Sequence, residues 1–536
     1  MKLKSIAFGA IISLSATLFI SGFDYSIAAS YSSEMSSCVP NSPWVVGYDH
    51  THKLVYLSCG PDAHLHPEST APQINQATGK PNGAIPAQAI AHSSNPSSPV
   101  SVDPQCAADP LVPAQWSAVQ KWSLTYLHCA RPYRYVTGNI NFGSPKTSLT
   151  PDSAMLPINN CKLSTAQNPG PGSGGRYFGQ PETYLNPTLS GKFLVIPVQF
   201  SDDKATTNPE NDYGKYFQFI SDYVKNSSDV PASVSFDVPN HYVPIANKIA
   251  SYNIGAGRNN PQFLADVAAA IKTDTSINTD GVDEIIIVAP PTTSPALFAN
   301  ITGPMGNPDG VLPYFPHVKG IYVEGSPSLV AQENNIWTAD PWITAHEAIN
   351  HHMGLDDSSD FGDSPANGSA MTAAQLGTGS WGNMSGVNGE LLIWDKWLAG
   401  FEDDSQIRCA PTNATTTTWL APSTTKSNLE KGLIIPTSAT TAIVVESERS
   451  TGYNFKFPKS SNGALVYTID SSITQHGMGV QVLSPKGRPP INWHDDYSLL
   501  QDSTLKQGES LSVSGLKITN VEAGAFGDVI KVSPLG

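Results

Sequence analysis

Apolar residues between positions 190 and 360 occur in two alternating patterns. Short, continuous apolar runs predict strands that are buried on both faces of a sheet. These runs are residues 192–200, 283–288 and 320–324. Between them, residues 213–225 have a helical pattern, and Asn260-Pro261 places a cap and a first-turn proline at the start of a helix through Ile271. Strands that alternate with helices predict an α/β sheet domain.

Beyond Cys409 the helical pattern stops. Short β-like runs separated by Ser, Thr, Asn and Gly take its place. They are residues 433–435, 442–446, 464–469 and 479–483. This pattern predicts an all-β, sandwich-like C-terminal module over residues 409–536.

The N-terminus has the three parts of a secretory signal. Lys2 and Lys4 precede an apolar run from Ile6 to Phe23, and small residues follow at Ala28 and Ala29. We expect a signal peptide over residues 1–29 and a secreted, extracellular protein. An uncleaved membrane anchor is the alternative. No other stretch is long and apolar enough to span a membrane, so no stable span is expected once the signal is removed.

Two stretches of low apolar content divide the rest of the chain. Residues 60–104 are rich in Pro, Ser, Asn and Gln and resemble a linker. Residues 168–175, N-P-G-P-G-S-G-G, mark a second break. We therefore expect an N-terminal region over residues 30–180, which is a propeptide, a cover for the next domain or an accessory module. The α/β sheet domain is expected over residues 181–408, before the C-terminal β module.

Composition narrows the class of protein. The formal net charge of −15 argues against a nucleic-acid partner, because binding to phosphates needs a basic surface. Six cysteines in a secreted chain predict disulfides, which makes the N-terminal region disulfide-containing. Cys38 and Cys59 flank a short β-like segment, residues 44–57, and are a candidate pair. No C-x-x-C pair is present, so a cysteine zinc site is not expected.

The segment 340–357, D-P-W-I-T-A-H-E-A-I-N-H-H-M-G-L-D-D, carries the candidate chemistry. Asp340 and Pro341 suit the start of a helix, and Gly354 suits its exit. A catalytic zinc needs three protein ligands and an open position, and a neighbouring carboxylate acts as general base. His346, His351 and Asp357 are the candidate ligands and Glu347 is the candidate base.

The spacing of the two histidines differs by one residue from the usual H-E-x-x-H motif. In an α-helix, side chains four residues apart differ by about 40° in direction, and those five apart by about 140°. A single π-type turn, which arises by insertion of one residue, returns the two histidines to one face. We therefore expect a π-type bulge between Glu347 and His351. Asn350 has the regular four-residue spacing from His346 but is a poor zinc ligand. His352 fits neither the four-residue nor the five-residue spacing and is expected to face the core or solvent.

Several further segments resemble one family. Gly379–Gly386, G-S-W-G-N-M-S-G, resembles a Met-turn with Met384 beneath the metal, and Trp394–Phe401, W-D-K-W-L-A-G-F, resembles the helix that follows it. Residues 193–202 resemble the strand that opens the catalytic domain of that family, and residues 444–448 and 463–470 resemble its β-rich extension. Together with H-E and H-x-x-G-x-x-D, these segments resemble the secreted zinc metallopeptidases of the immune inhibitor A type, over roughly residues 190–480.

The resemblance implies a metzincin-like α/β catalytic domain (a zincin) and a secreted zinc endopeptidase that acts on proteins or peptides. It implies zinc ligands at His346, His351 and Asp357 and a base at Glu347. The alternative is an inactive protein of the same fold, in which the insertion has removed the site and the β module mediates adhesion or binds glycans or proteins.

Two other groups of residues suggest metal binding. Residues 356–363, D-D-S-S-D-F-G-D, form an acidic loop of the kind that binds Ca²⁺, which the family is known to do. A solvated acidic turn is the alternative. His50, His52, His64 and His66 are either metal ligands or ordinary surface histidines.

Overall fold

The computed structural model describes most of the chain beyond residue 143 and short strands before it. The described residues are 44–48, 54–58, 74–75, 80–81, 115–121, 124–130, 135–138, 143–164, 175–179, 190–252, 261–293, 302–306, 315, 318, 320–324, 341–358, 377–379, 381–385, 389–454, 457, 459–473, 479–485, 500 and 503–536. The expected signal peptide, the spaced histidines and the candidate pair Cys38–Cys59 lie outside them. No helix among the described residues is long and apolar enough to cross a membrane.

The chain divides into two compact units, which meet in sequence at Pro132 and Tyr133. The described residues of the first unit form three antiparallel hairpins, and the β-like segment expected at residues 44–57 forms the first of them. The hairpins are β1 (Trp44–Tyr48) with β2 (Leu54–Ser58), β3 (Ile74–Asn75) with β4 (Lys80–Pro81), and β5 (Gln115–Lys121) with β6 (Leu124–Ala130). Of the expected linker, residues 60–104, only the third and fourth of these strands are described.

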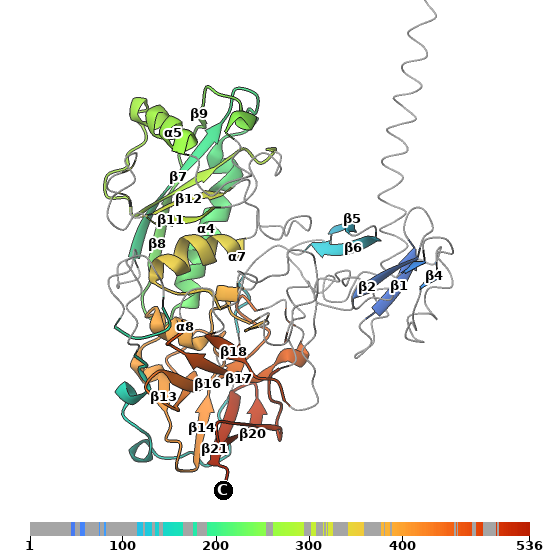
Figure 1. Cartoon of the computed structure of the whole chain (residues 1–536), viewed down its shortest axis with the longest axis vertical. Coiled ribbons are helices and arrows are strands. Elements are labelled where there is room, and N and C mark those ends of the chain that lie inside the picture. The colour runs from blue at the N-terminus through green and yellow to red at the C-terminus, as the bar shows by residue number, and fades with distance from the viewer. Residues whose placement is uncertain are drawn as a thin grey trace, which may run out of the picture. The chain divides into compact units, whose positions relative to one another are not determined.

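The second unit contains a mostly parallel sheet in the order β11-β12-β10-β7-β8 (Figure 1). Its strands are β7 (Ser190–Gln199), β8 (Ser233–Asp237), β9 (Val243–Pro244), β10 (Glu284–Val288), β11 (Thr302–Gly306) and β12 (Gly320–Glu324). The three strands predicted from the apolar runs are confirmed as β7, β10 and β12. β11 lies at one edge and is antiparallel to its neighbour.

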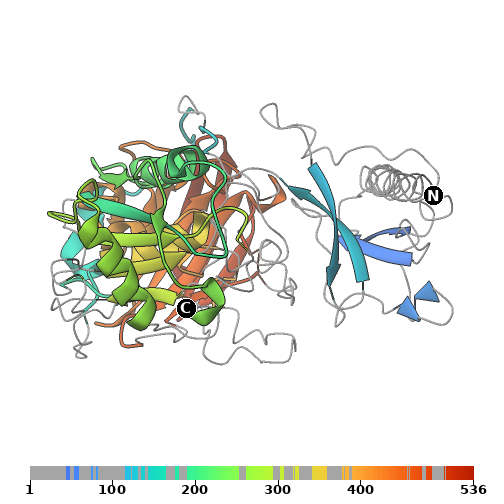
Figure 2. The same ribbon diagram turned by 90° about the horizontal axis from the view of Figure 1, so that it is seen from above.

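Helices cover both faces of this sheet, which is why its strands are continuously apolar. Phe193 and Val195 of β7 pack against α4 (Pro209–Ser227), and Leu194 and Ile196 pack against α5 (Pro261–Thr273) on the other face. Seen from above in Figure 2, the strands lie between the green α4 and the yellow-green α5. Asn208 caps α4 by accepting a hydrogen bond from the N–H of Asn211 at 2.9 Å.

The remaining helices of the described residues are short. They are α7 (Pro341–Thr344), α8 (Ile393–Leu398), and the single turns η1 (Asp152–Ala154), η2 (Ile158–Cys161), η3 (Ile249–Ser251), η5 (Ala345–Asn350), η6 (His351–Met353), η9 (Asn383–Ser385), η10 (Asp404–Gln406) and η11 (Lys459–Ser461). The helices predicted at 213–225 and from Pro261 are confirmed as α4 and α5.

Two β sheets follow, as the C-terminal pattern predicts. The first has the order β13-β15-β16-β17-β18 and the second the order β14-β21-β20-β19. Their strands are β13 (Ile407–Cys409), β14 (Thr416–Leu420), β15 (Gly432–Pro436), β16 (Thr441–Glu448), β17 (Gly463–Asp470), β18 (Val480–Val482), β19 (Ser510–Val513), β20 (Leu516–Gly524) and β21 (Gly527–Pro534). All four predicted β-like runs are confirmed as strands of the first sheet.

The first of these sheets is buried on both faces. Val445 and Val466 face the second sheet, where they join Ile518 and Val532 in one apolar cluster. The alternate residues, among them Val444, pack against α8 and η2 in a separate cluster. The two β sheets therefore form a sandwich. The face of the first sheet that points away from the second sheet is covered by α8 and η2.

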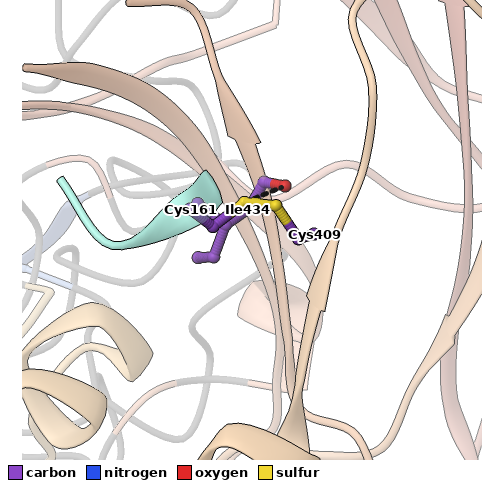
Figure 3. Close-up of a disulfide and its surroundings, with 3 residues drawn as sticks. All are labelled: Cys161, Cys409 and Ile434. Carbon is purple, nitrogen blue, oxygen red and sulfur yellow. Dashed lines mark hydrogen bonds between the residues drawn. A yellow bond between two sulfur atoms is a disulfide. The ribbon is translucent and has the colours of Figure 1, made fainter. Parts of the chain in front are cut away.

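The segment before residue 180 belongs to this second unit, whereas the sequence placed it in a separate N-terminal region. Cys161 forms a disulfide with Cys409, beside Ile434 of β15 (Figure 3). Thr150 donates its backbone N–H to the carbonyl of Thr417 at 2.9 Å. Residues 143–164 thus line the C-terminal sandwich, a placement that local sequence patterns do not reveal because the contacts with the sandwich are distant in sequence.

We predict that Cys161→Ser and Cys409→Ser each lower the free energy of unfolding by about 2–5 kcal/mol, because the bond closes a long loop. The two cysteines are separated by 248 positions. Denaturant unfolding of the oxidised proteins measures the loss. The double variant is the matched control and should lose no more than either single variant. Additive losses, or a non-reduced digest without the linked peptides, would contradict the pairing.

Candidate metal centre

The segment that carries the candidate chemistry is a helix with one widened turn, the yellow helix labelled α7 in Figure 1. It begins at Pro341, as predicted, and Asp340 lies outside the described residues. From Ala345 to Asn350 it is a π-helix, and the N–H of His351 donates to the carbonyl of His346, five residues earlier. The predicted π-type bulge is therefore confirmed. The helix ends at Gly354, whose φ of 87° favours glycine.

The widened turn brings the two imidazole rings together. Their centroids are 4.6 Å apart. Asp357 Oδ1 lies 2.9 Å from His346 Nε2 and 3.5 Å from His351 Nε2. One ligand atom from each of the three residues lies within 4.8 Å of the others, and no other group of this kind occurs among the described residues. All three ligands expected from the sequence therefore converge on one point.

Backbone carbonyls fix the tautomer of both histidines. His346 Nδ1 is 2.8 Å from the carbonyl oxygen of Asn383, and His351 Nδ1 is 3.0 Å from that of Leu355. A carbonyl only accepts, so each Nδ1 carries the proton and donates it. Each neutral ring then directs the lone pair of Nε2 into the centre. Metal-binding histidines are held in this way, with the outer nitrogen bonded to a carbonyl or carboxylate.

Electrostatics favour a positive charge in the centre. Burial opposes protonation of His351, but the hydrogen bond and the charge of Asp357, together with the charge of Glu347, outweigh it and raise the pKa to about 10. Around this point, the imidazole lone pairs and carboxylate oxygens that accept hydrogen bonds outnumber the groups that donate them. A divalent cation meets the same demand without a proton on either ring.

Asn350, one of the three residues between Glu347 and His351, has a clear structural role. The side-chain amide of Asn350 is fully buried and donates to Asn383 Oδ1 at 2.5 Å. Asn383 in turn donates from Nδ2 to the carbonyl of Trp342 at 3.1 Å. Asn350 therefore stabilises the residue whose carbonyl orients His346. The sequence indicates only that Asn350 is a poor zinc ligand, and it does not predict the contact with Asn383.

The turn expected to lie beneath the metal is attached to the centre at two points. Met384 is fully buried in the cluster that contains Ala345 and Ile349. Its carbonyl accepts the N–H of Ser358, next to the expected ligand Asp357, at 2.7 Å. Asn383, the residue before it, holds His346. The turn therefore stabilises both the helix and the ligand loop.

One side of the centre is open. The side chains of His346 and Asp357 are only 4% and 7% exposed, whereas those of His351 and Glu347 are 22% and 23% exposed. Glu347 Oε2 lies 3.9 Å from His351 Nε2. The carboxylate expected to act as base is therefore on the side of the centre that water reaches.

Two nearby groups lie away from the centre. His352 is buried, and its Nδ1 is 2.5 Å from Glu284 Oε2, so of its two expected positions it occupies the core. Burial raises the pKa of Glu284 to about 7, and the charge of His352 opposes this shift. In the acidic loop, Asp356 binds Arg176, and residues 359–363 lie outside the described residues. The calcium site stays a prediction.

The donor set fits zinc. Two neutral imidazole nitrogens and one carboxylate oxygen are common zinc ligands. Three protein ligands, rather than four, are typical of a catalytic site that keeps one position open. His346, His351 and Asp357 would hold the ion, and the exposed side of the centre faces Glu347.

No family model, no curated protein and no solved structure matches this chain.

Deletion of one residue at a time tests the role of the widened turn. Deleting Ala348 gives H-E-I-N-H and keeps an asparagine next to His351, so we expect a regular helix that still binds zinc. Deleting Asn350 restores the same spacing but removes the contact with Asn383, and it should weaken zinc binding by about 10–100-fold, as loss of an outer hydrogen-bond partner does. Competition with a chromophoric chelator measures both affinities. Equal losses in the two variants would show that Asn350 does not support His346.

Proposed function

We propose that the chain is a secreted zinc-dependent endopeptidase that hydrolyses peptide bonds in proteins. The observation that carries the proposal is the convergence of His346 Nε2, His351 Nε2 and Asp357 Oδ1, with both imidazoles oriented by backbone carbonyls. A set of three ligands beside an exposed carboxylate is the arrangement that metal-assisted hydrolysis requires.

A bound zinc ion supplies Lewis-acid chemistry: it makes water more acidic and polarises the carbonyl of the bond to be cleaved. Glu347 supplies the base. Its carboxylate is next in sequence to the ligand His346 and lies on the open side, so it can accept a proton from the attacking water and pass it to the leaving amine. His346 and Asp357 are shielded from solvent, which strengthens their hold on a cation.

The neighbouring sheet edge supports a peptide as substrate. β11 is the edge strand of the parallel sheet, and it lies against η5, the turn that carries His346 and Glu347. Among the described residues, only one side of β11 is paired with another strand. An extended peptide can pair with such an edge through main-chain hydrogen bonds, which position it without regard to most of its side chains.

We predict that Glu347→Gln lowers kcat by about 10²–10⁴-fold, because the amide cannot accept the proton. Zinc content should stay at one ion per chain, since Glu347 is not a ligand. Cleavage of an unfolded protein substrate and elemental analysis of the same sample give the two values. Glu210→Gln, at an exposed position in the first turn of α4, is the matched control and should change neither.

A fully zinc-loaded wild-type protein that cleaves no unfolded protein substrate would contradict the proposal. The chain would then be an inactive protein of the metallopeptidase fold that binds proteins or glycans. An unchanged rate in Glu347→Gln would instead contradict the assignment of the base.

A further inference from the structure

A buried arginine from the segment before the parallel sheet reaches the loop that carries the third ligand. Arg176 is 1% exposed. Its Nη1 donates to Asp356 Oδ2 and to the carbonyl of Ile473, each at 2.8 Å, and its Nη2 donates to the carbonyl of Asp357. We propose that Arg176 is a positioning residue of the metal centre, so that residues 175–179 belong to the mature enzyme. This inference rests on the proposed function.

The contacts of Arg176 fix the backbone of Asp357 on both sides. The N–H of Asp357 donates to Asp356 Oδ1 at 3.0 Å, while the other oxygen of that carboxylate binds Arg176. The carbonyl of Asp357 binds the guanidinium directly. With both peptide groups held, the side chain of Asp357 has little freedom except toward the two histidines. A planar guanidinium suits this task because its nitrogens reach two acceptors at once.

The arginine is itself held in place. Gly175, its neighbour, donates its N–H to the carbonyl of Gly354, the residue at which the ligand helix ends, at 3.0 Å. Gly479 leaves room for the guanidinium, since a Cβ there would lie 2.9 Å from Nη1. Residues 175–179, the end of the helix, Ile473 and Gly479 are therefore packed around one side chain.

The surrounding charges balance a guanidinium that is removed from water. Asp356 is its ion-pair partner and is itself buried. Asp395 of α8 is nearby: burial raises the pKa of this carboxyl to about 7, and the charge of Arg176 opposes the shift. Removal of Arg176 would leave buried carboxyl groups without their cation, an arrangement that proteins avoid. The loop that carries Asp357 would then have to move.

This arrangement limits where the chain can be processed. A cut after Arg176 that released the preceding segment would remove the arginine from the ligand loop. Release of that segment needs both a cut beyond Arg176 and reduction of the disulfide, so a cut alone leaves the arginine tethered. Residues 143–164 would remain attached through the disulfide of Cys161 with Cys409 even after such a cut.

Zinc affinity of the full-length secreted protein tests the inference. We expect Arg176→Gln to bind zinc about 10–100-fold more weakly, as loss of an outer-shell partner does. Arg176→Lys should lose less, because an ammonium keeps the charge but cannot bridge both acceptors. Arg408→Gln is the matched control: it removes ion pairs with Asp152 and Glu430 and should leave zinc affinity unchanged.

A second measurement separates positioning from general stability. With Co²⁺ in place of zinc, the visible absorption reports the ligand geometry, and it should change in Arg176→Gln but not in the control. Asp356→Asn keeps the arginine and serves if Arg176→Gln does not fold; it too should weaken zinc binding. Wild-type affinity and an unchanged cobalt spectrum in Arg176→Lys and Asp356→Asn would overturn the inference.

The outcome is distinct from that of the proposed function. A wild-type protein that binds zinc, loses affinity in the Arg176 variants and cleaves no peptide supports the inference and contradicts the endopeptidase. A wild-type protein that cleaves peptides, together with unchanged zinc affinity in the Arg176 variants, supports the endopeptidase and contradicts the inference. Absence of zinc binding in the wild type would overturn both.

Discussion

The candidate metal centre depends on one hydrogen bond, from the N–H of His351 to the carbonyl of His346. This bond closes a turn of five residues in place of four. It cancels a rotation of roughly 100°, the angle that one extra residue adds to an α-helix. Without it the two imidazoles would point to different faces, and Asp357 would meet only one of them. The extra residue is thus accommodated by the helix, at a type of turn often found at functional sites.

The centre is assembled from segments far apart in the chain. Asn383 orients His346, the backbone of Leu355 orients His351, and Arg176 holds the loop of Asp357. Each contact is to a backbone carbonyl or to a group that braces one. Such outer contacts orient the candidate ligands. The centre can therefore reach a metal-binding geometry only when the whole unit is folded.

Much of this structure could be predicted from local pattern. Apolar runs gave the strands, and the spacing of His346 and His351 required a π-type turn. Arg176 could not be predicted, because it follows a Gly- and Pro-rich stretch and all its partners are distant. For the same reason the sequence predicts a separate N-terminal region over residues 30–180, and Cys161 could not be paired with Cys409. The metzincin-like fold class and the resemblance to the immune inhibitor A type stay predictions.

X-ray absorption at the zinc edge of the purified wild-type protein tests the central claim most directly. Two imidazole nitrogens at about 2.0–2.1 Å and carboxylate or water oxygens at about 2.0–2.2 Å are expected, with no sulfur. The signature of one imidazole should disappear in His346→Ala and, separately, in His351→Ala. A spectrum with a single imidazole that persists in His346→Ala would show that the widened turn does not bring both histidines to the metal, and would contradict the account.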